Sequence, residues 1–183
     1  MPLQKLKDLD ARYSARLQVK AASSFLRPVF IFFAHSGDSW FWLIALVLIW
    51  IFGNQAWRSR SAFLIIGLVI LAVLVLIIKF SIKRPRPQGE WGGIYRTTDP
   101  HSFPSGHAAR SAALAVMALG IGPAWFAITL CIWAPLVGIS RVILGVHYLS
   151  DVIIGWIVGI VVGTVAILLM PTMQSLLPFL FLK

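Results

Sequence analysis

The sequence predicts an all-α membrane protein, with five to six transmembrane helices in a bundle and an N-terminal amphipathic helix on the membrane surface. Of its 183 residues, 59% are hydrophobic and 12% are charged, which is about half the charged fraction of a typical soluble domain. The apolar residues come in blocks long enough to cross a bilayer. This length predicts one membrane-embedded domain over residues 1–183.

The first predicted element is the amphipathic helix, over residues 1–20. Leucine and tyrosine recur at helical spacing there, and lysine and arginine occupy the positions between them. This pattern is typical of a helix that lies in the plane of a membrane surface. Residues 21–35 are apolar but short, so they either form a separate half-span or extend the first helix into one tilted span.

Five further segments are predicted to span the membrane: 40–52, 62–78, 105–119, 124–139 and 147–170. An apolar tail at 171–183 follows them and is expected to lie at the membrane interface. A polar loop at 80–104 separates the second span from the third, and its prolines exclude a regular helix. The last span carries Gly155, Gly159 and Gly163 at intervals of four. We expect this smooth stripe to pack against another helix of the same bundle rather than to form a dimer seam.

The charge balance favours an anionic partner. The net charge is +10, and the whole chain has six acidic residues. A basic excess in a membrane protein indicates lipid headgroups or phosphates rather than nucleic acid. Hard metal ions need several converging oxygen ligands, so we expect neither a metal ion nor another cofactor.

Three polar groups flank the predicted spans, at residues 79–87, 104–107 and 140–151. Ser105 and Gly106 begin a helix, where free N–H groups and the helix dipole favour an anion. Lys79, Arg86 and Arg141 add positive charge, and the two arginines can grip phosphate oxygens in pairs. Two spans separate the second group from the third, so all three groups are expected on one side of the membrane, where they form a phosphate site.

Two histidines divide the expected chemistry. His147 and Asp151 are four residues apart, so a helix that begins here brings them together on one face. A carboxylate on one ring nitrogen fixes the tautomer and leaves the other nitrogen free to attack. His107 has no carboxylate nearby in the sequence, and Arg110 one turn later disfavours its protonated form. His107 is nevertheless the candidate acid, because the negative substrate would assist its protonation.

Taken together, Lys79-x6-Arg86-Pro87, Pro104-Ser105-Gly106-His107 and Ser140-Arg141-x5-His147-x3-Asp151 resemble the three-part signature of the type-2 phosphatidic acid phosphatase superfamily. That superfamily also contains vanadium haloperoxidases and bacterial acid phosphatases. The resemblance covers the expected core, residues 60–165. It implies a metal-independent phosphatase with a phosphohistidine intermediate, commonly with six spans and an extracytoplasmic active site.

The resemblance also implies the role of each residue. His147 is the nucleophile, Asp151 orients it and His107 is the acid. The residues implied to bind phosphate are Lys79, Arg86, Ser105, Gly106 and Arg141.

The function expected is hydrolysis of a membrane lipid phosphate. Family members suggest undecaprenyl diphosphate, phosphatidylglycerol phosphate, phosphatidic acid or lipid A 1-phosphate as the substrate. A lipid phosphotransferase with the same phosphohistidine and a non-enzymatic phospholipid-binding protein are the alternatives, although binding alone needs no nucleophile. A haloperoxidase gains nothing from a membrane frame. The oligomeric state is left open.

The expected location is a bacterial inner membrane with the active site on the periplasmic side. This orientation depends on residues 21–35. If they cross, the basic N-terminus joins Arg58 and Arg60 in the cytoplasm, as the positive-inside rule favours. If they do not cross, the same rule favours a cytoplasmic site. The family resemblance favours the crossing arrangement, or an N-terminal helix that lies on the outer interface.

Overall fold

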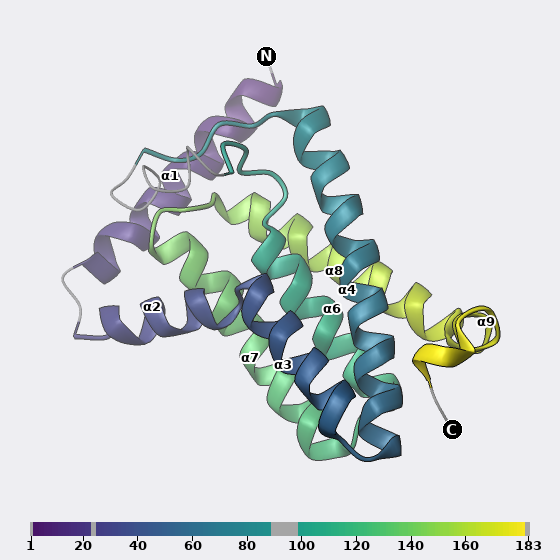
Figure 1. Ribbon diagram of the computed structural model, residues 1–183. Coiled ribbons are helices and arrows are strands. Elements are labelled where there is room, and N and C mark those ends of the chain that lie inside the picture. Colours follow the sequence, from purple (N-terminus) through teal and green to yellow (C-terminus); the bar gives the residue numbers. More distant parts are fainter. Residues whose placement is uncertain (1, 23–24, 89–98, 182–183) are drawn as a thin grey trace.

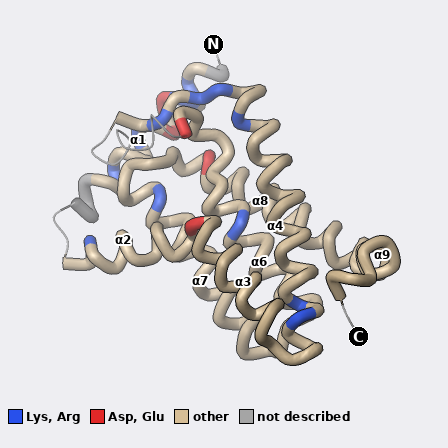
Figure 2. The backbone as a smooth tube through the Cα atoms, in the orientation of Figure 1, with Lys and Arg blue, Asp and Glu red and all other residues tan. Residues whose placement is uncertain are grey.

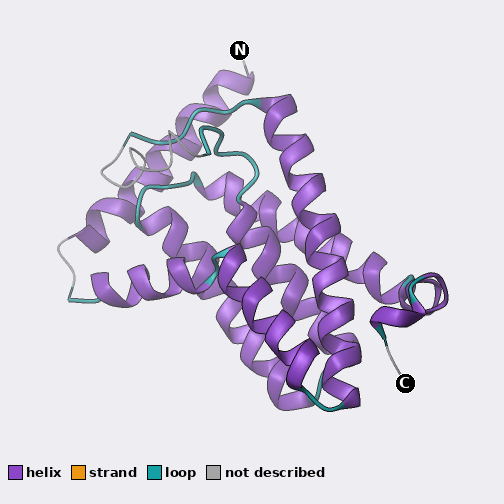
Figure 3. Cartoon of the chain, in the orientation of Figure 1, coloured by secondary structure: helices purple, strands orange, loops and turns teal. Residues whose placement is uncertain are grey.

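The computed structural model describes residues 2–22, 25–88 and 99–181, and the regular secondary structure within these ranges is helical (Figures 1 and 3). The helices, in order, are α1 (Pro2–Ala22), α2 (Arg27–Ser36), α3 (Ser39–Phe52), α4 (Gln55–Ile82), α6 (Gly106–Ile121), α7 (Ala124–Ile143), α8 (Leu149–Leu168) and α9 (Met170–Leu176), followed by a 3₁₀ turn at Pro178–Leu180. An isolated antiparallel bridge joins Pro85 to His101.

Helix α6 is the centre of the bundle and contacts α4, α7 and α8. Its alanine-rich faces let neighbouring helices approach closely. A Cβ atom added at Gly159 of α8 would lie 2.1 Å from the Ala109 carbonyl of α6, and one at Gly155 would lie 2.7 Å from the Ser105 carbonyl. The glycine stripe therefore packs inside the bundle, as the sequence predicted, because only a missing side chain permits this separation.

The membrane character expected from the sequence is supported by helix length and composition. Helices α4, α7 and α8 are each long and apolar enough to cross a bilayer. The pair α2 and α3 passes the same test together but bends by 55°, and α6 is a shorter apolar helix of 16 residues. The described part of the chain thus has three or four candidate spans, and the count of five to six stays a prediction.

The chain bends between α2 and α3, at Gly37 and Asp38. Asp38 stands at the N-cap of α3, but its side chain makes no capping hydrogen bond there. The carboxylate instead turns toward α6. Residues 27–36 form a helix of their own, so this segment contributes half of a bent pair rather than a straight span.

Charged residues gather at one end of the bundle, around α1 and the segment that follows α4 (Figure 2). Helix α1 contacts α7 and α8 at this end. Its apolar side chains remain exposed, namely Leu6, Leu9, Tyr13 and Leu17. The apolar face of this amphipathic helix is therefore not buried against the bundle. Its position on a membrane surface remains a prediction.

Candidate active site

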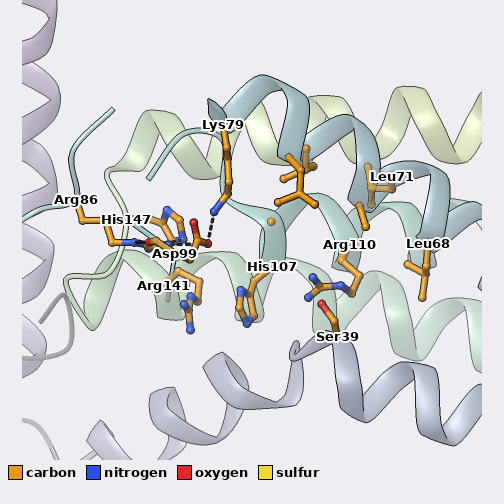
Figure 4. Close-up of a pocket in the computed structure, with 14 residues that line it drawn as sticks. Ser39, Leu68, Leu71, Lys79, Arg86, Asp99, His107, Arg110, Arg141 and His147 are labelled. Carbon is orange, nitrogen blue, oxygen red and sulfur yellow. Dashed lines mark hydrogen bonds and ion pairs between the residues drawn. The ribbon is translucent and has the colours of Figure 1, made fainter. Parts of the chain in front are cut away.

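The three polar groups that the sequence singled out meet around one cavity of about 270 Å³ (Figure 4). The polar side chains that line it come from α3, α4, α6, α7 and the segments that follow α4 and α7: Ser39, Lys79, Arg86, Asp99, His107, Arg110, Arg141 and His147. Leucine, alanine and valine side chains of α4 line the rest: Leu68, Leu71, Ala72, Val75 and Leu76. The cavity therefore has a cationic end and an apolar end.

The end of α4 brings Lys79 and Arg86 to the same place. The helix stops at Lys83, which adopts a left-handed conformation with φ of 51°. The chain beyond it is held by a hydrogen bond of 2.8 Å from the Ser102 N–H to the Arg84 carbonyl. Arg86 is thereby turned back toward the bundle, where 6% of its surface is exposed.

Arg86 contacts the predicted nucleophile directly. Its Nη1 donates to the Val146 carbonyl at 3.0 Å and lies 3.3 Å from Nε2 of His147. Its Nε donates to the backbone carbonyl of Asp99 at 2.7 Å. A phosphate oxygen bound to this guanidinium would therefore lie beside Nε2 of His147.

The Asp99 carboxylate lies in the same cavity as Lys79, Arg86 and Arg141, the three cations that the sequence predicts to bind phosphate, which are called the phosphate clamp below. It forms ion pairs with Lys79 and with Nη2 of Arg86, the latter at 2.9 Å. A carboxylate and a phosphate present similar oxygens to such cations, so a bound phosphate would replace Asp99. Asp99 lies outside the three-part sequence pattern, and its loop neighbours Glu90 and Arg96 lie outside the described residues.

His147 and Asp151 lie close together, although His147 does not open a helix. Gly145, with φ of +69°, turns the chain after α7, and α8 begins only at Leu149. Nδ1 of His147 and Oδ2 of Asp151 are 3.6 Å apart, slightly more than a hydrogen bond. The expected pair is thus present, with 1% and 0% of the two side chains exposed.

Burial makes His147 neutral. It lowers the pKa of the imidazole from 6.5 to about 4, and Arg141 and Arg86 act in the same direction, while the Asp151 carboxylate opposes them. At neutral pH the ring therefore keeps the nitrogen lone pair that a nucleophile needs.

His107 has no carboxylate nearby in the sequence, but the fold brings one to it from the N-cap of α3. Its Nε2 lies 2.7 Å from Oδ1 of Asp38, which is 69 residues away in sequence. Oδ2 of Asp38 also lies 3.3 Å from Nδ1 of His35. The negative charge of Asp38 offsets the positive charge of Arg110, which donates a hydrogen bond to the Gly37 carbonyl. The candidate acid therefore has a partner that stabilises its protonated form.

Ser105 and Asp151 stand behind the cavity rather than in its lining. The Ser105 hydroxyl accepts a hydrogen bond from the Ala108 N–H at 3.4 Å and so caps α6. The Ser105 N–H donates to the Asp151 carbonyl at 2.9 Å, which ties the second group to the third. Gly106 does line the cavity. A contact of Ser105 with phosphate remains a prediction.

Acidic partners are the residues that sequence reasoning missed. Neither Asp38 nor Asp99 belongs to the three-part pattern from which the site was predicted. The scarcity of acids, six in the chain, was the available signal, because each acid in so apolar a protein needs a reason to be there. In the part of the chain that the structure describes, no group of three or more histidine, cysteine or acidic side chains could hold a metal ion.

Comparison with known proteins relates this geometry to a family. The model of the PAP2 superfamily matches residues 60–175. An undecaprenyl-diphosphatase of Sulfolobus acidocaldarius is 35% identical over 138 residues, which are 73% of this chain and 66% of that protein. The match thus spans just under two thirds of this relative's own length.

Two crystal structures share the fold. A PAP2-type phosphatidylglycerolphosphate phosphatase from Bacillus subtilis superposes with a TM-score of 0.72, 26% identity, and coverage of 88% of this chain and 84% of that chain. Aquifex aeolicus LpxE gives a TM-score of 0.67, again with 26% identity, over 85% of this chain and 92% of that chain.

Proposed function

Because the chain belongs to the PAP2 superfamily, we propose that it is a lipid phosphatase that hydrolyses a membrane lipid phosphate or diphosphate through a phosphohistidine on His147. The observation that carries this proposal is the 3.3 Å separation of Arg86 Nη1 and His147 Nε2 in a cavity shared with Lys79 and Arg141. Cations that bind phosphate and a neutral nucleophile beside them are the two requirements of such a reaction.

The shape of the cavity supports an amphiphilic substrate. Lys79, Arg86, Arg141 and His147 lie at one end and Leu68 and Leu71 at the other (Figure 4). A phosphate would occupy the cationic end, while an apolar chain would lie along α4. The named relatives support a lipid phosphate or diphosphate of this kind, such as undecaprenyl diphosphate or phosphatidylglycerol phosphate. Phosphatidic acid and lipid A 1-phosphate stay candidates from the family resemblance.

In the first half of the reaction, Nε2 of His147 attacks phosphorus. The bond between phosphorus and the leaving oxygen breaks, and His107 gives that oxygen its proton. Asp151 stabilises the positive charge that develops on His147, and the Asp38 carboxylate favours the protonated form of His107. Lys79, Arg86 and Arg141 stabilise the negative charge on the phosphoryl oxygens.

In the second half, His107 removes a proton from a water molecule, whose oxygen attacks the phosphohistidine. The phosphorus–nitrogen bond breaks, inorganic phosphate leaves, and His147 recovers its lone pair. A phosphotransferase would differ only here, because the hydroxyl group of a second lipid would replace water.

The deciding experiment is phosphate release from purified lipid phosphates and diphosphates by the full chain in detergent or vesicles. We expect release from at least one of them, loss of release in His147→Ala, and a rate that EDTA leaves nearly unchanged. Cys131→Ser, an exposed change on α7, is the control. Full activity of His147→Ala would contradict the nucleophile assignment. Transfer of labelled phosphate to an added lipid alcohol would instead identify a phosphotransferase, and binding without turnover would favour a lipid-binding protein.

A further inference from the structure

Arg84, which has no role in the proposed reaction, links helix α1 to Asp151, the carboxylate beside the proposed nucleophile. Nη1 of Arg84 donates to Oδ1 of Asp151 at 2.7 Å, and its Nη2 donates to Oδ2 of Asp10 at 2.7 Å. The Arg84 guanidinium also lies 4.0 Å from the centre of the Tyr148 ring. Arg84 is thus held by α1, by the first turn of α8 and by Tyr148, which directly precedes α8.

Helix α1 is itself fixed to the beginning of α8. Oδ1 of Asp10 accepts a hydrogen bond from the Ser150 N–H at 3.1 Å, and the Ser14 hydroxyl accepts one from the Leu149 N–H at 2.9 Å. The first N–H groups of a helix have no partner within the helix. Side chains of α1 supply these partners, so the position of α1 determines where the first turn of α8, which carries Asp151, is held.

The position of the Asp151 carboxylate is fixed by contacts to both of its oxygens. Oδ2 accepts a hydrogen bond from the Tyr148 N–H at 2.9 Å and lies 3.6 Å from His147, while Oδ1 is occupied by Arg84. None of its surface is exposed. A buried carboxylate remains charged only when a cation and hydrogen bonds compensate for lost water. Arg84 supplies that cation from the side opposite His147.

We propose that Arg84 is a positioning residue of the active site, that Asp10 holds it in place, and that α1 is in this way a fourth part of the catalytic centre. Arg84 keeps Asp151 charged and aimed at Nδ1 of His147, and it touches neither phosphate nor leaving group. The proposal rests on the proposed function, since it gives Asp151 the task of orienting the nucleophile.

The alternative is that the Asp10–Arg84 pair only fastens α1 to the bundle. That role predicts a lower thermal stability with an unchanged turnover in the protein that remains folded. A positioning role predicts a lower kcat with a nearly unchanged KM, because substrate contacts are kept. It also predicts that the acid limb of the kcat profile moves to higher pH, since Asp151 without its cation ionises less readily.

The test compares Arg84→Gln, Arg84→Lys and Asp10→Asn in the full chain, with phosphate release from the lipid substrate found active. We expect Arg84→Gln to lower kcat about tenfold or more, as loss of a carboxylate or amide that orients a functional histidine does. Arg84→Lys, which keeps the charge but not the fork, should restore the pH profile and part of kcat. Lys83→Gln and Asp8→Asn, the neighbouring changes of like charge, should leave both unchanged.

A double substitution isolates the link to α1. If Asp10 acts through Arg84, Asp10→Asn lowers kcat in the native chain but has less than about a twofold effect in the Arg84→Gln background. The proposal would be overturned if the kcat losses of Asp10→Asn and Arg84→Gln multiplied in the double variant. It would also be overturned if Arg84→Gln left both kcat and the pH profile unchanged. Size-exclusion profiles and thermal unfolding of each variant identify any that fail to fold.

Asp151→Asn separates this proposal from the proposed function. If Asp151→Asn abolishes turnover while Arg84→Gln and Asp10→Asn do not change it, the positioning role of Arg84 fails and the proposed function stands. If Asp151→Asn itself retains full turnover, the assigned role of Asp151 fails, and the proposal about Arg84 fails with it.

Discussion

Nε2 of His107 and Oδ1 of Asp38 lie 2.7 Å apart, although α3, α4 and the polar loop separate them in sequence. The candidate active site therefore has two histidine–carboxylate pairs, one at His107 and one at His147. What distinguishes the two histidines is their place in the cavity. His147 adjoins Arg86 within the phosphate clamp, whereas His107 lies on the way to the apolar end (Figure 4).

Asp38→Asn is expected to impair protonation of the leaving group. Without the carboxylate, His107 is harder to protonate, and general acid catalysis contributes roughly 10²–10⁴-fold to such reactions. We expect kcat to fall more than about tenfold for a lipid alkoxide leaving group and much less for p-nitrophenyl phosphate, whose leaving group needs no proton. Equal losses for both substrates would mean that Asp38 has another role.

Asp99→Asn is expected to tighten the binding of phosphate analogues. The Asp99 carboxylate competes for Lys79 and Arg86, so its neutral amide should leave more of the positive charge to a ligand. We expect the inhibition constant of vanadate to fall by about tenfold, which corresponds to about 1.4 kcal/mol. Asp8→Asn on the exposed face of α1 is the control. An unchanged or weaker inhibition would indicate that Asp99 supports the clamp rather than competing with the phosphate.

Arg110→Gln is expected to separate diphosphate from monophosphate substrates. Arg110 and Ser39 line the cavity beyond His107, away from the clamp (Figure 4). In a diphosphate, the phosphate that stays on the lipid would lie there, and a guanidinium would stabilise its charge. We expect kcat/KM for a lipid diphosphate to fall about tenfold further than for the matching monophosphate. A uniform loss would assign Arg110 to holding the Gly37 carbonyl.

The titration of His147 is expected near pH 4, since burial lowers its pKa to about 4. The ring is neutral above that pH and loses its lone pair to a proton below it. Formation of the phosphoenzyme should therefore stay intact as pH falls through 6.5 and weaken only near pH 4–5. Histidine-selective ¹⁵N NMR of the full chain, with the signal assigned by His147→Gln, measures this directly. A midpoint near 6.5 would mean that the ring is hydrated.

The orientation in the membrane can be measured with single cysteines in a Cys131→Ser background. Gln88 lies near the active-site end, and Gln55 begins α4 at the opposite end, near Arg58 and Arg60. We expect an impermeant maleimide to label Gln88→Cys but not Gln55→Cys from the periplasmic side. The reverse pattern would place the site in the cytoplasm.

Most of the residues that meet around the cavity could be predicted from the sequence, because their signals are local. Lys79, Arg86, Gly106 and His107 lie at the ends of apolar blocks, and Asp151 follows His147 at helical spacing. Helix ends on one side of a bundle bring such residues together whatever the details of packing. The glycine stripe of α8 was predictable for the same reason, since a run of small residues requires a close neighbour.

The number of membrane spans was harder to predict from the sequence, because length and hydropathy alone cannot show where a helix bends. The segment 27–52 is apolar enough to read as spans, but the chain breaks at Gly37 and Asp38 and turns by 55°. The sequence contained the turn but not the angle, which depends on how α2 packs against α7.

By itself, the sequence determined the membrane character and the phosphatase family, and it predicted His147 as the nucleophile with Asp151 as its carboxylate. Tertiary structure decided the partners of three other acids: Asp10 with Arg84, Asp38 with His107, and Asp99 with Lys79 and Arg86. The physical reason is the range of each interaction. A helix turn or a helix end is set by neighbours in the chain, whereas these ion pairs join segments that meet only once the bundle has packed.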